Sequence, residues 1–302
     1  MSDADTLTAV LACPSCRAPL TRDPQSFACG GCRRRFDDRA GLPWLFPEPD
    51  AAAAEWRGRL GLLLSHLEKE AALHRAALAA RPALAPTVER LEAQARALED
   101  HAGRLRALLE PLGLAADEHR PAVHLALGTQ LPAAQGLTNY YANPHRDWCW
   151  GDQENAASLA AVAAALGPGG APRRLAVLGA GGGRLAYDLH QSLPLELTVA
   201  LAAPFADGAF DAVLTPWFVD IVPDDLPDLM ARINRLLSPD GRWIYFGSLA
   251  WADRPPERCY GMEELLALLP AAGFESGPVA EPSLPYMRSP ASRHGRIETV
   301  LC

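Results

Sequence analysis

Four cysteines near the start of the chain are spaced to bind a metal. Cys13 and Cys16 form one Cys-x-x-Cys pair, and Cys29 and Cys32 form a second pair. Each pair turns sharply enough to aim two thiolates at one point, and two pairs supply the tetrahedral sulfur set that Zn²⁺ prefers. All four ligands then come from the protein, so the sequence predicts a closed, structural zinc site. A piece of about 35 residues has too small a core to fold alone, so zinc binding should supply its folding free energy.

The cysteine-containing segment, residues 13–47, resembles the zinc ribbon of tRNA-methyltransferase activator subunits, which also precedes some methyltransferases. The arginine run at residues 33–35 could contact nucleic acid. However, Asp37, Asp38 and the net charge of −8 favour a solvated surface. The ribbon is therefore expected to be structural.

A run of small residues follows a short apolar segment later in the chain. Residues 175–178 are typical of a buried strand, residues 179–183 read Gly-Ala-Gly-Gly-Gly, and a helix is expected from Arg184. Glycines let the backbone approach a ligand, and a helix N-terminus offers free amides and a positive dipole end. The pattern alone does not separate dinucleotide sites from S-adenosylmethionine sites.

Several separated blocks add to this glycine loop. Residues 204–213 and 236–244 resemble class I methyltransferases. Three more blocks resemble the carnosine N-methyltransferase family, which methylates an imidazole nitrogen of histidine: residues 146–148 (Arg-Asp-Trp) with Glu154, residues 179–186, and residues 215–220 (Thr-Pro-Trp-Phe-Val-Asp). This resemblance covers roughly residues 139–302. It implies S-adenosylmethionine as cofactor, and the cofactor-binding residues that it implies are Gly179, Gly181, Gly183, Arg184, Arg146, Trp148 and Pro216.

The same resemblance gives Asp220 a catalytic role, in which it holds the imidazole of the substrate. Trp217, Phe218 and Tyr286 are the other implied substrate contacts. The chemistry is consistent, because neutral imidazole has one donor nitrogen and one acceptor nitrogen. A carboxylate that accepts the N–H fixes the tautomer and leaves the other lone pair free to attack. For Arg146, two roles stay open: pairing with the cofactor carboxylate, or holding Asp147.

Two departures from the family pattern stand out. Asp211 follows Leu178 by only 33 positions, too few for the three crossovers of the class I order. Residues 202 and 203 are alanines where an acidic residue should hold the ribose hydroxyls, so weak cofactor binding is expected. Tyr286 is the remaining aromatic candidate near the substrate. The substrate is therefore either carnosine or another histidine derivative, such as a thiohistidine on the way to ovothiol.

The elements that must position these residues form an α/β fold. Strands are expected at residues 175–178, 197–201, 212–215, 243–246 and 298–302, and helices at residues 184–191, 226–237 and 262–269, with a turn at 238–241. Strands alternating with helices predict an open, mostly parallel, Rossmann-like class I methyltransferase sheet, shortened between its first and fourth strands. The predicted segments are a zinc ribbon at 1–49, a helical hairpin with a cofactor lid at 50–155, and the methyltransferase domain at 156–302.

The region between ribbon and sheet reads as a helical hairpin. Leu60, Leu63, Leu64 and Leu67 share one helix face, and residues 88–109 carry apolar residues at alternating spacings of three and four. Pro82 and Pro86 interrupt the helices between them. This hairpin is expected to be a packing arm or a homodimer contact.

Composition sets the remaining limits. The chain has 302 residues, 49% of them hydrophobic and 21% charged, which is ordinary for a globular protein and excludes whole-chain disorder. Residues 1–12 lack the features of a signal peptide, and no apolar run approaches the ~20 residues of a spanning helix. The expected partner is a small histidine-derived molecule, with neither nucleic acid nor membrane, and the expected location is the reducing cytoplasm.

Three functions follow from these features. The leading prediction is an S-adenosylmethionine-dependent N-methyltransferase that acts on the imidazole of a small histidine derivative. An rRNA guanine N-methyltransferase is the second, because some of those enzymes also begin with a cysteine ribbon. The third is a degenerate methyltransferase fold that serves as a zinc-bearing partner, and the short interval after Leu178 is its best support.

Overall fold

The structure is a computed structural model, and it describes residues 8–82, 84–114, 142–167, 173–193, 196–200, 204–222, 224–251, 254–286 and 296–299. The chain divides into two compact units. One comprises residues 1–20 and 130–302, and the other comprises residues 21–129. The boundaries of these units differ from those of the three predicted segments, and the predicted boundaries stay predictions. No described helix has the length and apolar character needed to cross a membrane.

Four short strands form the ribbon, in the order β1 (Leu20–Asp23), β2 (Ser26–Cys29), β3 (Arg35–Arg39) and β4 (Leu42–Pro43). Phe27 of β2 stands directly opposite Phe36 of the antiparallel β3, and each is only 1% exposed. These two rings supply much of the ribbon's apolar core. So small a core agrees with the expectation that a metal must contribute to its folding.

Two long helices, α2 (Pro49–Ala79) and α3 (Ala85–Leu109), form the predicted hairpin. The four leucines at 60, 63, 64 and 67 are buried, and Leu91, Ala95, Ala102 and Leu109 are the buried positions of the α3 seam. Arg75 and Glu99 pair between the helices at 2.6 Å, and Arg106 pairs with Glu68. Pro86 lies in the first turn of α3, where a missing N–H costs nothing.

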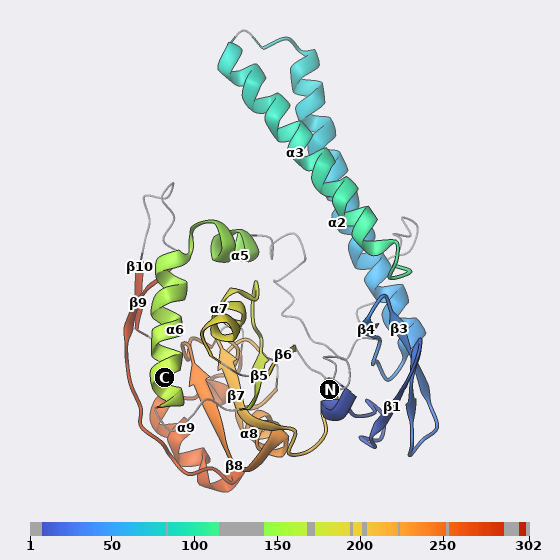
Figure 1. Ribbon diagram of the computed structural model, residues 1–302. Helices are drawn as coiled ribbons and strands as arrows, with labels where there is room; N and C mark the ends of the chain where they lie inside the picture. The colour runs from blue at the N-terminus through green and yellow to red at the C-terminus, as the bar shows by residue number, and fades with distance from the viewer. Residues whose placement is uncertain are drawn as a thin grey trace. The chain divides into compact units, whose positions relative to one another are not determined.

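A four-stranded parallel sheet lies at the centre of the other unit (Figure 1). Its strands are β5 (Arg174–Leu178), β6 (Glu196–Ala200), β7 (Phe210–Pro216) and β8 (Leu237–Phe246), in the spatial order β6-β5-β7-β8. Every neighbouring pair is parallel. The chain runs from β5 to β6 on one side and then returns to β7 on the other. This reversal places a switch point between β5 and β7, where open α/β sheets bind their ligands.

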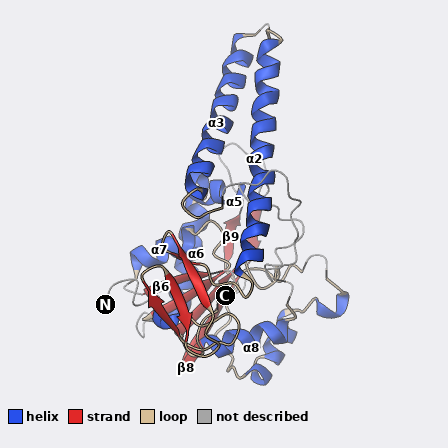
Figure 2. Cartoon of the chain, turned by 90° about the vertical axis from the view of Figure 1, so that its right-hand side faces the viewer, coloured by secondary structure: helices blue, strands red, loops and turns tan. Residues whose placement is uncertain are grey.

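The face of the sheet that carries Leu175, Val177, Leu214 and Phe246 is covered by α6 (Asp152–Leu166) and α7 (Arg184–Ser192). α8 (Leu226–Leu236) contacts β7 and β8, and its buried residues lie outside that cluster, as expected for a helix on the opposite face. β9 (Ser283–Tyr286) and β10 (Arg296–Thr299) form a separate antiparallel pair, and β9 contacts α6 (Figure 2). α9 (Met262–Leu268) lies between β8 and β9 in sequence.

The connection from β6 to β7 is short, as the sequence predicted. Nine residues, 201–209, lead from the end of β6 to the start of β7. They reach at most about 30 Å, while a helical crossover needs a dozen residues or more. The connection is therefore too short for a helical crossover, and its described part, residues 204–209, contains no helix.

The N-terminal segment pairs with this short connection. Leu11 forms an antiparallel bridge with Phe205. The Ala12 N–H donates to the Pro204 carbonyl at 2.7 Å, and the Ala206 N–H donates to the Val10 carbonyl at 3.0 Å. Residues 10–12 and Phe205 are all buried. The segment that leads into the first cysteine pair thus contributes to the core of the sheet unit.

One local expectation was wrong. The turn expected at residues 238–241 lies inside β8, because Leu237 already pairs with Phe210 and Arg242 pairs with Ala212. The extra residues form a bulge, in which Asp240 takes a φ of +61°. The described part of the lid segment is helical: α5 (Ala142–His145), the π-helical turn η1 (Arg146–Trp150) and then α6. β10 ends at Thr299, and residues 300–302 of the expected last strand lie outside the described residues.

Candidate functional site

The glycine loop joins the end of β5 to the start of α7, beside the switch point. Gly179, Gly181 and Gly183 have φ values of +73°, +58° and +81°. Side chains strongly disfavour this left-handed region, so the loop requires glycine at these positions. Gly183 is the residue before the first turn of α7. The free amides of that helix end therefore face the same edge of the sheet as the loop.

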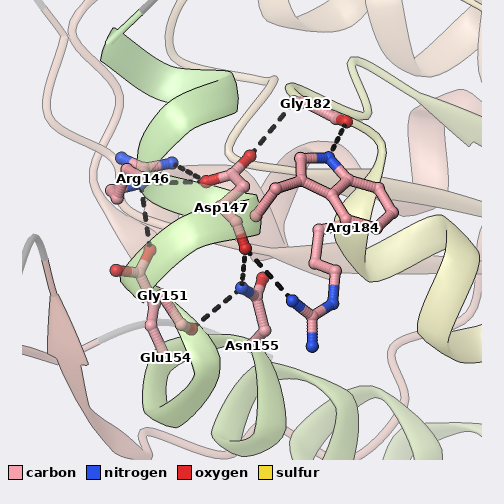
Figure 3. A network of polar contacts seen from close by, with 8 residues as sticks. Arg146, Asp147, Gly151, Glu154, Asn155, Gly182 and Arg184 are labelled. Carbon is pink, nitrogen blue, oxygen red and sulfur yellow. Dashed lines mark hydrogen bonds and ion pairs between the residues drawn. The ribbon is translucent and has the colours of Figure 1, made fainter.

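Two side chains of η1 hold the loop at Gly182 (Figure 3). The Gly182 N–H donates to Asp147 Oδ2 at 3.1 Å, and Trp148 Nε1 donates to the Gly182 carbonyl at 2.7 Å. A Cβ on Gly182 would lie 2.7 Å from the same Asp147 oxygen. Gly182 was not among the predicted site residues, yet it is the glycine that η1 holds.

Arg146 stands behind Asp147 in this network (Figure 3). Its Nε and Nη2 both donate to Asp147 Oδ1, at 2.9 and 2.7 Å, and its Nε lies 4.0 Å from a Glu154 oxygen. Burial opposes the charge of Arg146, but Asp147 and Glu154 outweigh it, so the pKa of Arg146 is raised. Of the two roles left open for Arg146, the geometry shows the holding of Asp147.

Asn155 and Arg184 fix the backbone of the same turn (Figure 3). Asn155 Nδ2 donates to the carbonyls of Asp147 and Gly151, at 3.0 and 2.8 Å. Arg184 Nη1 reaches the Asp147 carbonyl at 3.3 Å, while its Nε pairs with Asp188. Arg184, which was predicted to bind the cofactor, connects α7 to η1 in the structure.

The predicted aromatic residues lie after β7 and in β9, and one of them packs against the loop. The Phe218 ring lies so close to Gly179 that a Cβ there would come within 2.2 Å of it. Trp217 packs against Tyr286, with ring centroids 4.8 Å apart, and Arg146 lies over the Tyr286 ring at 5.5 Å. Trp217 follows Pro216, the last residue of β7. The structure thus places Phe218 against the glycine loop, and Tyr286 contacts both Trp217 and Arg146.

Asp220 belongs to a second cluster, built from the segments after β7 and β8. It is 8% exposed, and Ser248 Oγ donates to its Oδ2 at 3.0 Å. Burial raises the pKa of Asp220, opposed by the hydrogen bond from Ser248, by the N–H groups of Asp220 and Ala250, and by the charge of Arg254. Burial, with the Asp220 charge, raises the pKa of the Tyr245 hydroxyl as well. The carboxylate lies at the carboxyl edge of the sheet.

The predicted metal ligands come together at the ribbon. The sulfur atoms of Cys13, Cys16, Cys29 and Cys32 lie within 4.8 Å of one another. Four thiolates around one zinc ion stand about 3.8 Å apart, given Zn–S bonds of about 2.3 Å. The N–H groups of Gly31 and Cys32 both point at Cys29 Sγ, each at 3.3 Å. Such donors suit a thiolate, so the donor set fits zinc.

Sequence reasoning missed the residues that hold the others. Gly182 lay in the glycine run, and Asp147 lay in the Arg-Asp-Trp block, so both were visible. No motif in the sequence indicated Asn155, Ser248 or Tyr245, because their roles depend on partners distant in the chain. Residues 202 and 203, where the ribose-binding acid was expected, lie outside the described residues.

The comparisons with known proteins support a methyltransferase. Residues 184–245, from the start of α7 nearly to the end of β8, match the family model described as a methyltransferase domain. No curated protein matches the chain.

Two solved structures are similar to part of the chain. One is a SAM-dependent methyltransferase, possible histamine N-methyltransferase, from Thermotoga maritima: identity 18%, TM-score 0.37, covering 55% of this chain and 94% of that one. The other is a Burkholderia thailandensis 1,6-didemethyltoxoflavin-N1-methyltransferase with bound S-adenosylhomocysteine: identity 20%, TM-score 0.34, covering 54% and 85%. At these values neither likeness bears on the substrate.

The predicted Rossmann-like parallel sheet and the predicted methyltransferase are confirmed at this level. The family match also supports S-adenosylmethionine as the methyl donor. The family match does not identify the substrate, the roles of individual site residues or a zinc ion.

Proposed function

We propose that the protein methylates an imidazole nitrogen of a small histidine derivative. The observation that carries this proposal is the buried Asp220 carboxylate, which stands at the carboxyl edge of the sheet after β7, the strand that borders the switch point. The glycine loop ends the neighbouring strand, β5. A methyl donor on the loop and an imidazole on Asp220 would then occupy adjacent positions.

Asp220 would orient the ring and take up charge during transfer. Its carboxylate accepts the N–H of one ring nitrogen in a charge-assisted hydrogen bond, which leaves the other nitrogen with its lone pair for attack. As that nitrogen gains the methyl group, the ring becomes positively charged and its remaining N–H becomes more acidic. Burial raises the pKa of Asp220, and a carboxylate of raised pKa is a better acceptor for that proton.

The glycine loop and η1 would hold the cofactor. S-adenosylmethionine, when bound, supplies a methyl group on a positively charged sulfur. Positive φ at Gly179, Gly181 and Gly183 leaves backbone free of side chains where the cofactor would approach. Asp147 and Trp148 fix the position of Gly182, so the loop is preorganised rather than ordered by the ligand.

The four cysteines would hold one structural zinc ion. Their sulfur atoms lie close enough for tetrahedral coordination, and a site filled by four thiolates has no position for substrate. The supporting observation is the pair of backbone N–H groups on Cys29 Sγ. We expect the ion to stabilise the ribbon and to take no part in methyl transfer.

The deciding experiment is a methyl-transfer screen. Purified protein is incubated with labelled S-adenosylmethionine and with histidine, thiohistidine, carnosine or structured RNA. Transfer to an imidazole compound supports the proposal, and mass spectrometry then identifies the methylated nitrogen. Transfer to RNA alone would instead support a guanine N-methyltransferase. Absence of S-adenosylmethionine binding in calorimetry would leave a scaffold role, for which the short connection between β6 and β7 is the structural support.

A further inference from the structure

The segments after β7 and β8 are tied together next to Asp220. Trp251 Nε1 donates to the Tyr260 carbonyl at 2.6 Å, and the Tyr260 hydroxyl donates to Asp225 Oδ1 at 2.8 Å. Arg254 Nη1 donates to the Asp224 carbonyl at 3.0 Å. The bonds of Tyr260 and Arg254 connect the segment after β8 to the segment that carries Asp220, and the Trp251 bond lies within the segment after β8. The side chains of both segments are therefore held in fixed positions at the same edge of the sheet.

Arg254 is the unusual member of this group. Its guanidinium lies 4.7 Å from the centre of the Trp251 ring, which holds the side chain by a cation–π contact. Its Nη2 atom is buried and has no hydrogen-bond partner among the described residues. A buried donor without an acceptor is rare in folded proteins, and a charged one is rarer, because its desolvation is not compensated. Such a donor calls for an acceptor that binds from outside the chain.

The acceptor that suits this donor is a carboxylate. A guanidinium offers parallel N–H groups in a plane that matches the two oxygens of a carboxylate. Arg254 is bonded to Asp224 in the segment that carries Asp220, and its positive charge acts on the pKa of the Asp220 carboxyl in the direction opposite to burial. A ligand that satisfies both must present a donor to Asp220 and an acid group to Arg254. Amino acids with a basic or N–H-bearing side chain have that arrangement.

We propose that Arg254 binds the carboxylate of the substrate, so that the protein acts on free amino acids or C-terminal residues and rejects their decarboxylated amines. This inference rests on the proposed function, because it names the substrate class of the same site. Arg254 is a specificity residue here, while Asp220 contacts the ring. The contact with Trp251 and the bond to Asp224 leave the buried Nη2 as the part of the guanidinium without a hydrogen-bond partner among the described residues, and a ligand carboxylate that reaches it must displace the side chains that cover it.

Matched pairs of ligands test the assignment. Binding of histidine and histamine, and of tyrosine and tyramine, is measured by calorimetry with and without S-adenosylhomocysteine. Each pair differs by one carboxylate, and the two pairs differ in the ring. We expect the unmodified protein to bind histidine at least tenfold more tightly than histamine. Arg254→Gln should abolish that ratio by weakening histidine alone, and Arg254→Lys, which keeps the charge, should restore part of it.

Arg258→Gln is the control. Arg258 lies on the same segment, is half-exposed and stands 3.9 Å from Asp225, so its loss should leave the ratio unchanged. Equal affinity within each pair, no measurable binding of any of the four compounds, or an equal loss for histidine and histamine in Arg254→Gln would overturn the assignment. A preference for each amino acid over its amine, together with equal affinity for histidine and tyrosine, would retain Arg254 and reject the imidazole proposal. Equal binding of histidine and histamine, both tighter than tyrosine and tyramine, would retain the imidazole proposal and reject the role of Arg254.

Discussion

The contact between Gly182 and Asp147 shows how little space separates η1 from the glycine loop. The Asp147 carboxylate uses one oxygen for Arg146 and the other for the Gly182 N–H. Because a hydrogen bond at this distance leaves no room for a methyl group, glycine is required at position 182 for a reason other than backbone conformation. At Gly181, by contrast, an added Cβ would have its nearest neighbour 3.7 Å away, and the restriction there is the φ of +58°.

Gly182→Ala should weaken binding of S-adenosylmethionine about tenfold, equivalent to about 1.4 kcal/mol. The added methyl group would meet Asp147 Oδ2 at 2.7 Å and the Pro144 Cα at 3.1 Å, so η1 or the loop must shift. Calorimetric titration with the cofactor measures the change. Gly103→Ala on α3, where a Cβ meets nothing within 4 Å, is the matched control and should leave affinity unchanged. Equal affinities for all three proteins would contradict the role given to the loop.

Asp220→Asn should separate stability from activity. Burial raises the pKa of Asp220, so its charged form is disfavoured in the folded state. The stability that goes with the protonated carboxyl is fully present below the unfolded pKa and is lost as pH rises through the raised folded value. The asparagine variant escapes that loss. Its melting temperature should therefore exceed that of the unmodified protein at pH 7, and the difference should shrink as the pH falls toward 4.

The same variant should lose methyl transfer by at least ~10²-fold, the scale of a positioned catalytic group. An asparagine NH₂ can donate to the ring and so favour the wrong tautomer, while cofactor affinity should change little. Thermal unfolding at several pH values and turnover assays measure the two effects. An unchanged rate would remove Asp220 from the mechanism, and a lower melting temperature at pH 7 would show that its ionisation is not costly.

At the scale of the elements, local periodicity was the most reliable guide. The apolar spacing of the hairpin helices placed their buried faces well, and the alternation of strands and helices predicted the parallel sheet. The bulge in β8 was not predictable, because a Ser-Pro-Asp-Gly sequence suits a turn equally well, and only its pairing with β7 decides. Roles of Asn155 and Ser248 were hidden for the same reason: each depends on a contact with an element distant in the chain.

The ribbon should lose its fold when its metal site is damaged. Cys29→Ser removes a thiolate that also accepts two backbone N–H bonds, so zinc content should fall well below one ion per chain and the ribbon should become sensitive to proteases. Metal analysis and limited proteolysis measure this. Cys149→Ser, at an exposed cysteine outside the cluster, is the control and should retain zinc. Full zinc content in Cys29→Ser would reject the four-thiolate site.

At the scale of the whole molecule, residues 10–12 and 204–206 act as one structural piece. Ala12→Pro removes the N–H that donates to Pro204 and should destabilise the sheet unit by about 1–3 kcal/mol, the cost of a buried acceptor left unpaired. Ala12→Gly keeps the N–H and serves as the control. Thermal unfolding, followed by cofactor-dependent stabilisation, measures the effect. Equal melting temperatures for the two variants would show that the Ala12 N–H bond to Pro204 contributes nothing measurable to stability.

This pairing also bears on how the chain is made. Residues 10–12 leave the ribosome long before residues 204–206, and at ~5–20 residues per second the delay is roughly 10 to 40 seconds. During that time the apolar residues 10–12 have no partner from the sheet unit, and exposed apolar backbone of this kind is a hazard for aggregation. Expression fragments that begin after the ribbon would lack the segment altogether. The nascent chain must therefore keep residues 10–12 available until residues 204–206 have been synthesised.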